Sequence, residues 1–261
     1  MYPFLFQIPG TSVRIPSYGF FLAMSFLLGY LFMERCFRKE APDKVTAIIG
    51  VFPWIVISSL IGSRLFHVIF ERPDFYLHNP IAVFHVWKGG QVFYGGLIAA
   101  ILGSYCYCRL IRISFSWFAD VAICAVALAQ ILARIGCFLA GCCWGKVCTL
   151  PWAVTFTHPE TIAGLKHVSL HPTQLYQSMA NLITFLICFY FLKRKRFNGE
   201  VLLWYGVLYP VGRIIIEVFR ADQSRGFLIP DVLSISQFIS LVIFTGALIF
   251  LVRGKPLPYI S

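Results

Sequence analysis

Four charged residues lie in or beside apolar segments, where they could bind an anionic ligand. Arg134 lies in "ARIGCFLAGCCWGK" (133–146), and Arg213, Glu217 and Arg220 lie in "GRIIIEVFR" (212–220). A charged side chain at the centre of a membrane span costs about 2.5–3.5 kcal/mol, so it usually faces a cavity or a partner. The spacings of four and three residues place Arg213, Glu217 and Arg220 on one face of a helix.

Arg134 differs from Arg213 because no acidic residue lies within four positions of it. For Arg213 and Glu217 the alternative is a structural ion pair near the membrane interface, with Arg220 as an interfacial anchor. A guanidinium fork matches the geometry of a phosphate better than an ammonium group does. We therefore expect Arg134 and Arg213, from two helices, to clamp the phosphate of a phospholipid.

Four cysteines follow Arg134 closely, in the spacing C-x4-C-C-x4-C: Cys137, Cys142, Cys143 and Cys148. This spacing is not typical of a zinc site, so we expect no metal ligands here. A disulfide and simple packing both remain open as interpretations. A membrane thiol oxidoreductase would need Cys142 and Cys143, whereas a transferase would tolerate serine at both positions.

The composition indicates a membrane protein. Of the 261 residues, 59% are hydrophobic and 13% are charged, whereas about a quarter of a soluble domain is charged. The net charge of +11 comes with basic residues in short loops between apolar runs. This pattern is typical of membrane orientation signals, and no nucleic-acid-binding motif accompanies it, so we expect no nucleic acid partner.

The apolar segments predict an all-α, polytopic bundle of about seven transmembrane helices in a single domain, residues 1–261. The expected spans cover 17–33, 46–70, 94–111, 118–140, 175–192, 201–219 and 234–252. The N-terminal stretch lacks the features of a cleaved signal peptide. Lys and Arg, above all "KRKR" (193–196), favour an N-terminus outside and a cytoplasmic C-terminus.

Small and polar residues accompany these charges. Gly136 and Gly145 flank Arg134, and glycine pairs occur in "KGGQVFYGGL" (88–97). Glycine permits close helix approach and backbone contact with a ligand, although a tight turn is the alternative. In "HPTQLYQ" (171–177), His171, Gln174 and Tyr176 should lie at the outer interface. A structural hydrogen bond for His171 and an aromatic belt for Tyr176 are the alternatives.

Taken together, these segments resemble the prolipoprotein diacylglyceryl transferases of bacteria over nearly the whole chain. The similar motifs, in the order of the family, are "IPSYGFFLAM", "GGQVFYGGLIAA", "ARIGCFLAGCCWGK", "HPTQLYQ", "GRIIIEVFR" and "LSISQ". The resemblance implies a seven-helix bundle of the bacterial cytoplasmic (inner) membrane. It also implies transfer of a diacylglyceryl group from phosphatidylglycerol to the thiol of a lipobox cysteine in a preprolipoprotein. The products are a thioether and glycerol phosphate, and no cofactor or metal is expected.

The resemblance also implies roles for individual residues. Arg134 and Arg213 match the two essential arginines of the family, and the Gly95–Gly96 pair matches its glycine pair. The other positions expected to bind substrate are Tyr18, Gly136, Cys137, Gly145, His171, Gln174, Tyr176, Glu217 and Arg220.

The chain departs from the common pattern of the family at four positions. Tyr94 replaces a frequent His, Cys137 a frequent Asn, Ala133 a frequent Gly and Gln177 a frequent Glu. Tyrosine is a weak base at neutral pH because its pKa is near 10. The proton acceptor could therefore be Tyr94 through a chain of hydrogen bonds, His171, Glu217 or water.

Two other classes of function would also place charges inside a bundle. One is a transporter, which inverted repeats would favour, and none is evident. The other is a phospholipid-binding membrane protein without transferase activity. The sequence specifies neither the oligomeric state nor the preferred acyl chains.

Overall fold

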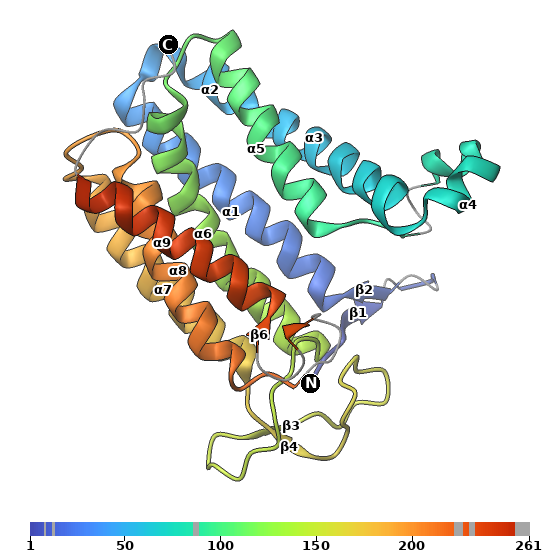
Figure 1. Cartoon of the computed structure of the whole chain (residues 1–261). Coiled ribbons are helices and arrows are strands. Elements are labelled where there is room, and N and C mark those ends of the chain that lie inside the picture. The colour runs from blue at the N-terminus through green and yellow to red at the C-terminus, as the bar shows by residue number, and fades with distance from the viewer. Residues whose placement is uncertain (8, 12–13, 86–88, 222–226, 230–232, 254–261) are drawn as a thin grey trace. The chain divides into compact units, whose positions relative to one another are not determined.

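The computed structural model describes residues 1–7, 9–11, 14–85, 89–221, 227–229 and 233–253 (Figure 1). These residues form two compact units. The described residues of the first unit lie within Met1–Phe32 and Ala119–Tyr259, and those of the second within Met33–Phe118. The helices α1 (Ser17–Glu40) and α6 (Phe115–Ala140) each contribute to both units.

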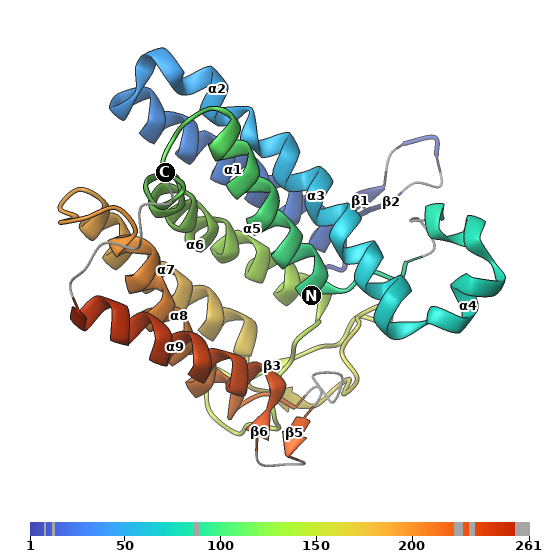
Figure 2. The same ribbon diagram turned by 45° about the horizontal axis from the view of Figure 1, so that its top comes forward.

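The first unit is built from long helices. Besides its parts of α1 and α6, it contains α7 (Thr173–Leu192), α8 (Glu200–Glu217) and α9 (Ile235–Arg253). Helix α8 packs between α7 and α9, and the three run side by side in both views of the ribbon (Figures 1 and 2). Because neighbouring helices are antiparallel, the end of α6, the start of α7 and the end of α8 lie at the same end of the unit.

A buried carboxylate on α6 fixes the start of α8. Asp120 accepts hydrogen bonds from the backbone N–H groups of Gly199, Val201 and Leu202 at 2.9–3.1 Å, and Lys195 Nζ lies 3.3 Å away. The first N–H groups of a helix lack intrahelical partners, so a carboxylate there satisfies them and complements the helix dipole. This contact fixes where α8 begins relative to α6.

The described residues of the first unit also form three small antiparallel sheets. They pair β1 (Phe4–Gln7) with β2 (Arg14–Pro16), β3 (Val154–Thr155) with β4 (Ser169–Leu170), and β5 (Phe227–Ile229) with β6 (Leu233–Ser234). The segment between α6 and α7 has its own small core of Phe156, Ala163 and Leu170. The connection is therefore an ordered structure rather than an extended linker.

The second unit is centred on a pair of closely packed helices. After η1 (Pro42–Lys44) and α2 (Val45–Ile49), it contains α3 (Val51–Phe66), η2 (His67–Glu71), α4 (Pro73–His78), η3 (Pro80–Phe84) and α5 (Phe93–Leu110). Helices α3 and α5 make the most extensive helix contact in this unit. Arg64 donates hydrogen bonds to the carbonyls of Ala82, Val83 and Gly89 and so ties the α4–η3 segment to α3.

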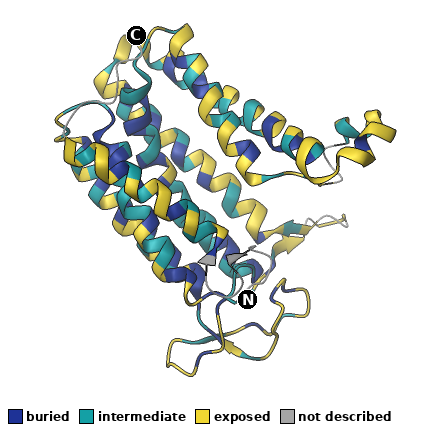
Figure 3. Ribbon diagram, in the orientation of Figure 1, coloured by how far each residue is buried: buried dark blue, intermediate teal, exposed yellow. Residues whose placement is uncertain are grey.

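The outer faces of the helices are apolar. Five helical segments in the described residues are long and apolar enough to cross a membrane: Ser17–Glu40, Pro42–Glu71, Phe115–Ala140, Thr173–Leu192 and Ile235–Arg253. Exposed residues recur along them (Figure 3), and only 11% of the apolar window of α9 is buried. Since water would penalise such surfaces, they face lipid. The prediction of an all-α, multi-pass membrane protein is confirmed.

The remaining two predicted spans coincide with α5 and α8, which are 18 residues each. Neither is among the five described segments that are long and apolar enough to cross a membrane, and α8 carries Glu200, Arg213 and Glu217. The count of seven spans and the orientation of the termini therefore stay predictions.

Candidate active site

A polar seam connects α6 and α8 in the first unit. On α8, Tyr209, Arg213 and Glu217 recur every four residues and so share one face. Their counterpart on α6 is Arg134, which interacts electrostatically with Tyr209. One turn earlier, the hydroxyl of Tyr205 donates to Gln130 Oε1 at 3.4 Å. The two helices thus turn polar faces toward each other inside an otherwise apolar unit.

Arg213 and Glu217 form the ion pair that their spacing predicted. Arg213 Nη2 lies 3.1 Å from Glu217 Oε2, and the two side chains are 13% and 2% exposed. Arg213 also donates to the hydroxyl of Ser236, at the start of α9, at 3.5 Å. Ser234 of β6 and Ser236 of α9 also form hydrogen bonds with the Glu217 carboxylate. Three segments, α8, β6 and α9, therefore hold the Arg213–Glu217 pair in place.

Two further arginines lie near this pair. Arg220 is 7% exposed and repels both Arg213 and Arg134 electrostatically. Three guanidinium groups thus gather at one end of the first unit, and two of them, those of Arg213 and Arg220, attract the carboxylate of Glu217. Like charges that are kept together away from water favour the binding of an anion.

The loop after α6 reaches this cluster through Gly145. Gly145 forms an antiparallel bridge with Arg220, its N–H donates to the His171 carbonyl at 3.2 Å, and the Lys146 N–H donates to the Phe219 carbonyl at 2.7 Å. A Cβ on Gly145 would lie 2.6 Å from the His171 carbonyl oxygen and 2.9 Å from that of Phe219. Only glycine fits this position without displacing backbone, so Gly145 lets the loop approach the segments of His171 and Phe219 closely, whereas its expected contact with substrate stays a prediction.

The first turn of α7 holds the same loop from the other side. Gln174 Nε2 donates to the Cys142 carbonyl and Thr173 Oγ1 donates to the Cys143 carbonyl, each at 2.7 Å. Tyr176 accepts a hydrogen bond from Trp152 Nε1 at 2.8 Å, and its hydroxyl lies 3.1 Å from His171 Nδ1. His171, Gln174 and Tyr176 thus order the loop, which agrees with the structural alternative for His171.

Gly136 brings α1 close to the Arg134 turn of α6. A Cβ at Gly136 would lie 2.8 Å from Phe21 Cβ and 3.4 Å from Tyr18 Cα. The Tyr18 hydroxyl consequently interacts with the guanidinium of Arg134 and with the thiols that follow it. The structure thus brings together ten of the predicted positions in the first unit: Tyr18, Arg134, Gly136, Gly145, His171, Gln174, Tyr176, Arg213, Glu217 and Arg220.

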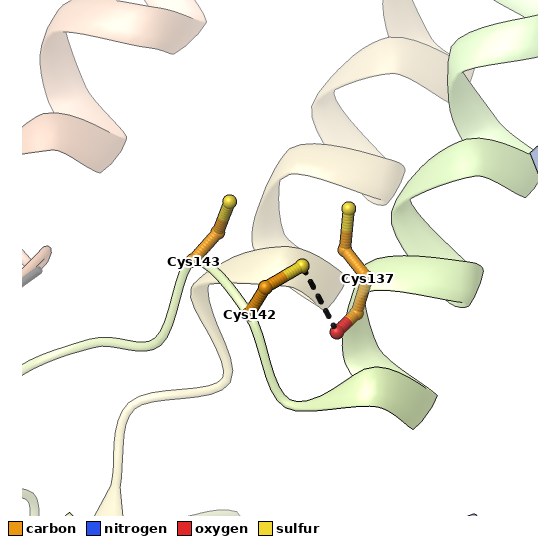
Figure 4. Close-up of side chains that lie close together, drawn as sticks. All are labelled: Cys137, Cys142 and Cys143. Carbon is orange, nitrogen blue, oxygen red and sulfur yellow. Dashed lines mark hydrogen bonds between the residues drawn. The ribbon is translucent and has the colours of Figure 1, made fainter. Parts of the chain in front are cut away.

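Cys137, also a predicted position, joins two other thiols here. Cys137 lies near the end of α6, three residues after Arg134, and Cys142 and Cys143 follow in the loop (Figure 4). Arg134 Nη1 lies 3.9 Å from Cys143 Sγ. Hydrogen bonds from the Cys137 and Cys142 thiols lower the pKa of the Cys143 thiol, with help from the guanidinium groups of Arg220 and Arg134. The same contacts raise the pKa of Cys142, so a thiolate is favoured at Cys143.

Tyr94, Gly95 and Gly96 belong to the second unit, at the start of α5. A Cβ on Gly95 would lie 2.6 Å from the Gly62 carbonyl oxygen, and one on Gly96 would lie 3.0 Å from Ser59 Oγ. The glycine pair therefore lets α5 approach α3, whereas its expected contact with substrate stays a prediction. Tyr94 is exposed.

Two residues beside the arginine cluster were not expected from the sequence. Tyr209 lies four residues before Arg213, so the same helical spacing that paired Arg213 with Glu217 could have identified it. For Cys143 the sequence left a disulfide and simple packing open, and it did not predict a contact with Arg134. Its backbone adopts a positive φ of 59°, and no sequence signal indicates this for a cysteine.

Comparison with known proteins identifies the family. The family model described as prolipoprotein diacylglyceryl transferase matches residues 3–253. The chain belongs to this family. A phosphatidylglycerol-prolipoprotein diacylglyceryl transferase of Clostridium tetani is 34% identical over 256 residues, covering 96% of this chain and 97% of the relative. One of Finegoldia magna is 32% identical over 245 residues, covering 94% and 93%. The resemblance drawn from the sequence is confirmed, as is the assignment of the chain as a transferase enzyme.

Proposed function

We propose that this chain transfers the diacylglyceryl group of phosphatidylglycerol to the thiol of a lipobox cysteine in a preprolipoprotein, and releases glycerol phosphate. The relatives that cover nearly the whole chain carry the name of this activity. The observation that carries the proposal is the gathering of Arg134, Arg213 and Arg220, which act on one another electrostatically, beside the Arg213–Glu217 ion pair. This is the charge pattern that a phospholipid phosphate requires.

In the proposed complex, Arg134 and Arg213 hold the phosphate from α6 and α8. Glu217 pairs with Arg213 and keeps its fork in one orientation, while Arg220 adds positive charge beside it. These donors stabilise the charge that develops on the leaving phosphate oxygen, and such preorganised groups are worth about 3–4 kcal/mol each in other enzymes.

The transfer itself exchanges one bond for another. The cysteine thiol of the prolipoprotein loses its proton to the acceptor, and its sulfur forms a bond to the terminal glyceryl carbon. The carbon–oxygen bond to the phosphate breaks, and its electron pair stays on the phosphate oxygen. The product is a thioether and the leaving group is glycerol phosphate. Positive guanidinium groups nearby favour both the attacking thiolate and the departing phosphate.

The ordered loop between α6 and α7 lies beside the arginine cluster. Gly145 and His171 join the loop to α7 and α8, and Gln174 fixes its turn, so these residues act on the substrate by holding the loop in place. Tyr18 and Cys137 supply polar groups on the side of α1 and α6. Tyr94 and the Gly95–Gly96 pair are assigned to substrate contact on the family resemblance.

The proposal includes an orientation in the membrane. Seven spans with the N-terminus outside would place the arginine cluster on the outer side of the bacterial cytoplasmic membrane. The basic run Lys193–Arg196 between α7 and α8 would then lie on the cytoplasmic side. Prolipoprotein signal peptides and phosphatidylglycerol would reach the single catalytic domain from that membrane.

The test is transfer of a labelled diacylglyceryl group from phosphatidylglycerol to a lipobox peptide in detergent. We expect Arg134→Ala and Arg213→Ala to lower the rate by at least about 100-fold, the lower range for loss of one preorganised donor. Arg38→Ala is the matched control, since that side chain is 66% exposed and pairs with Glu34 on the surface of α1. It should transfer at the wild-type rate.

Loss of folding can be distinguished from loss of catalysis in the same preparations. Both arginine variants should remain folded and inserted, as judged by their elution and their unfolding temperature in detergent. Full activity of Arg134→Ala in a folded sample would refute the phosphate clamp. Rates of Tyr94→Phe and His171→Asn across the neutral pH range then distinguish the candidate proton acceptors.

A further inference from the structure

Three sulfur atoms meet beside Arg134, although the spacing of the cysteines is not that of a usual metal site. The Sγ atoms of Cys137, Cys142 and Cys143 all lie within 4.8 Å of one another. Cys137 comes from the last turns of α6, and the other two come from the turn that folds back over it (Figure 4). The fold, rather than the spacing, assembles the group.

The separation of the sulfurs suits one metal ion. Zinc–thiolate bonds are about 2.3 Å long, which places sulfurs around one ion about 4 Å apart. The three atoms therefore need to move by less than about 1 Å each to bind the same ion. Rotation of thiol side chains is sufficient for such a movement.

The surroundings favour a soft ion with thiolate ligands. The cluster offers sulfur alone, and thiolates select Cu(I), zinc and related ions over magnesium or calcium. A metal bound by three thiolates carries net negative charge, which the guanidinium of Arg134, 3.9 Å from Cys143 Sγ, would offset.

The backbone holds the third sulfur in place. Cys143 has a φ of 59°, a conformation that costs a non-glycine residue about 1–3 kcal/mol and tends to occur at functional sites. The hydrogen bond from Thr173 to the Cys143 carbonyl at 2.7 Å maintains this turn.

We propose that Cys137, Cys142 and Cys143 form a binding site for a thiophilic metal ion such as Cd(II), Zn(II) or Cu(I). On binding, those of the three sulfurs that still carry a proton release it to solvent, and three sulfur–metal bonds form. A water molecule completes the coordination of Cd(II) or Zn(II). Neither the sulfurs nor the metal changes oxidation state.

The site has a consequence for the proposed transferase reaction. A metal–thiolate complex is an anion beside Arg134, and so it competes with the lipid phosphate for the same guanidinium. Thiophilic ions should therefore inhibit transfer. This consequence rests on the proposed function, whereas metal binding itself does not.

The direct test is titration of the fully reduced full-length protein in detergent with Cd(II). We expect one equivalent to produce the ultraviolet charge-transfer band of cadmium thiolates. Cys142→Ser should weaken cadmium binding at least about tenfold, because substitutions of residues that merely contact a metal ligand already lower metal affinity by about that factor. Cys148→Ser and Cys106→Ser are the controls, because one removes a buried thiol nearby and the other an exposed thiol. Both should bind like the wild type.

Several results would overturn the site. One is the absence of the band in reduced wild type, and another is a band of equal strength and affinity in Cys142→Ser. A third is a pair of thiols in the purified protein that reacts only after reduction, with no cadmium binding afterwards, since this would indicate a disulfide instead. In the transfer assay, Cys142→Ser should be active and less sensitive to Cd(II). Cadmium binding without inhibition would retain the metal site and reject its competition with phosphate.

Discussion

Gly145 provides the sharpest test of how the site is assembled, and the perturbation is Gly145→Ala. The added Cβ would lie 2.6 Å from the His171 carbonyl oxygen and 2.9 Å from that of Phe219, whereas ordinary contact begins at 3.4 Å. To restore ordinary contact, the carbonyl oxygens of His171 and Phe219 must move away by about 0.8 and 0.5 Å, because a closely packed interior leaves no void for the added methyl group. Both belong to backbone, so no flexible side chain can absorb the clash.

The size of the effect follows from the bonds that these carbonyls accept. They receive the N–H groups of Gly145 and Lys146 at 3.2 and 2.7 Å, and the shift lengthens both bonds. Overpacking of this kind costs about 1–3 kcal/mol of folding free energy. Because Arg220 is bridged to Gly145, the arginine cluster shifts as well, and a displacement of about 1 Å can cost a hundredfold in rate.

The assay compares Gly145→Ala with Gly246→Ala, at a glycine in α9 where an added methyl group would have no neighbour within 4 Å among the described residues. We expect Gly145→Ala to unfold at lower temperature in detergent and to transfer diacylglyceryl groups at least about tenfold more slowly, given the sensitivity of rate to displacement. Gly246→Ala should be neutral or more stable by up to about 1 kcal/mol. Wild-type rate and stability in Gly145→Ala would refute the close approach.

Two further substitutions test the supports of the seam. Asp120→Ala should destabilise the protein by about 2 kcal/mol or more, because it leaves N–H groups at the start of α8 unpaired. Thermal unfolding in detergent measures this, and an unchanged unfolding temperature would show that α8 does not depend on the cap. Glu217→Gln should lower the rate of transfer, because Arg213 loses the carboxylate that orients it, and should destabilise the protein by about 3 kcal/mol, as loss of one partner of a buried pair does. Equal rates for Glu217→Gln and wild type would assign Glu217 a purely structural role.

The local features of this chain could be predicted from its sequence, because they depend on residues close together in it. An apolar run of about 20 residues is long enough to cross a bilayer wherever it lies, so the membrane class and the helix positions followed directly. The pairing of Arg213 with Glu217 followed from helical periodicity, and the motif around Arg134 indicated the family.

Contacts between distant segments required the tertiary structure. Asp120 caps a helix that begins only at Glu200, and Gly95 meets Gly62 on another helix, yet neither sequence spacing indicates a partner. The sequence by itself determined that arginines would lie in membrane helices, because composition and periodicity set where helices form and which faces they share. Only the fold decided that Arg134, Arg213 and Arg220 gather beside one another and that three cysteines converge beside Arg134. That arrangement depends on backbone segments packing closely at glycines, and such packing is specified by the whole chain rather than by any one stretch of it.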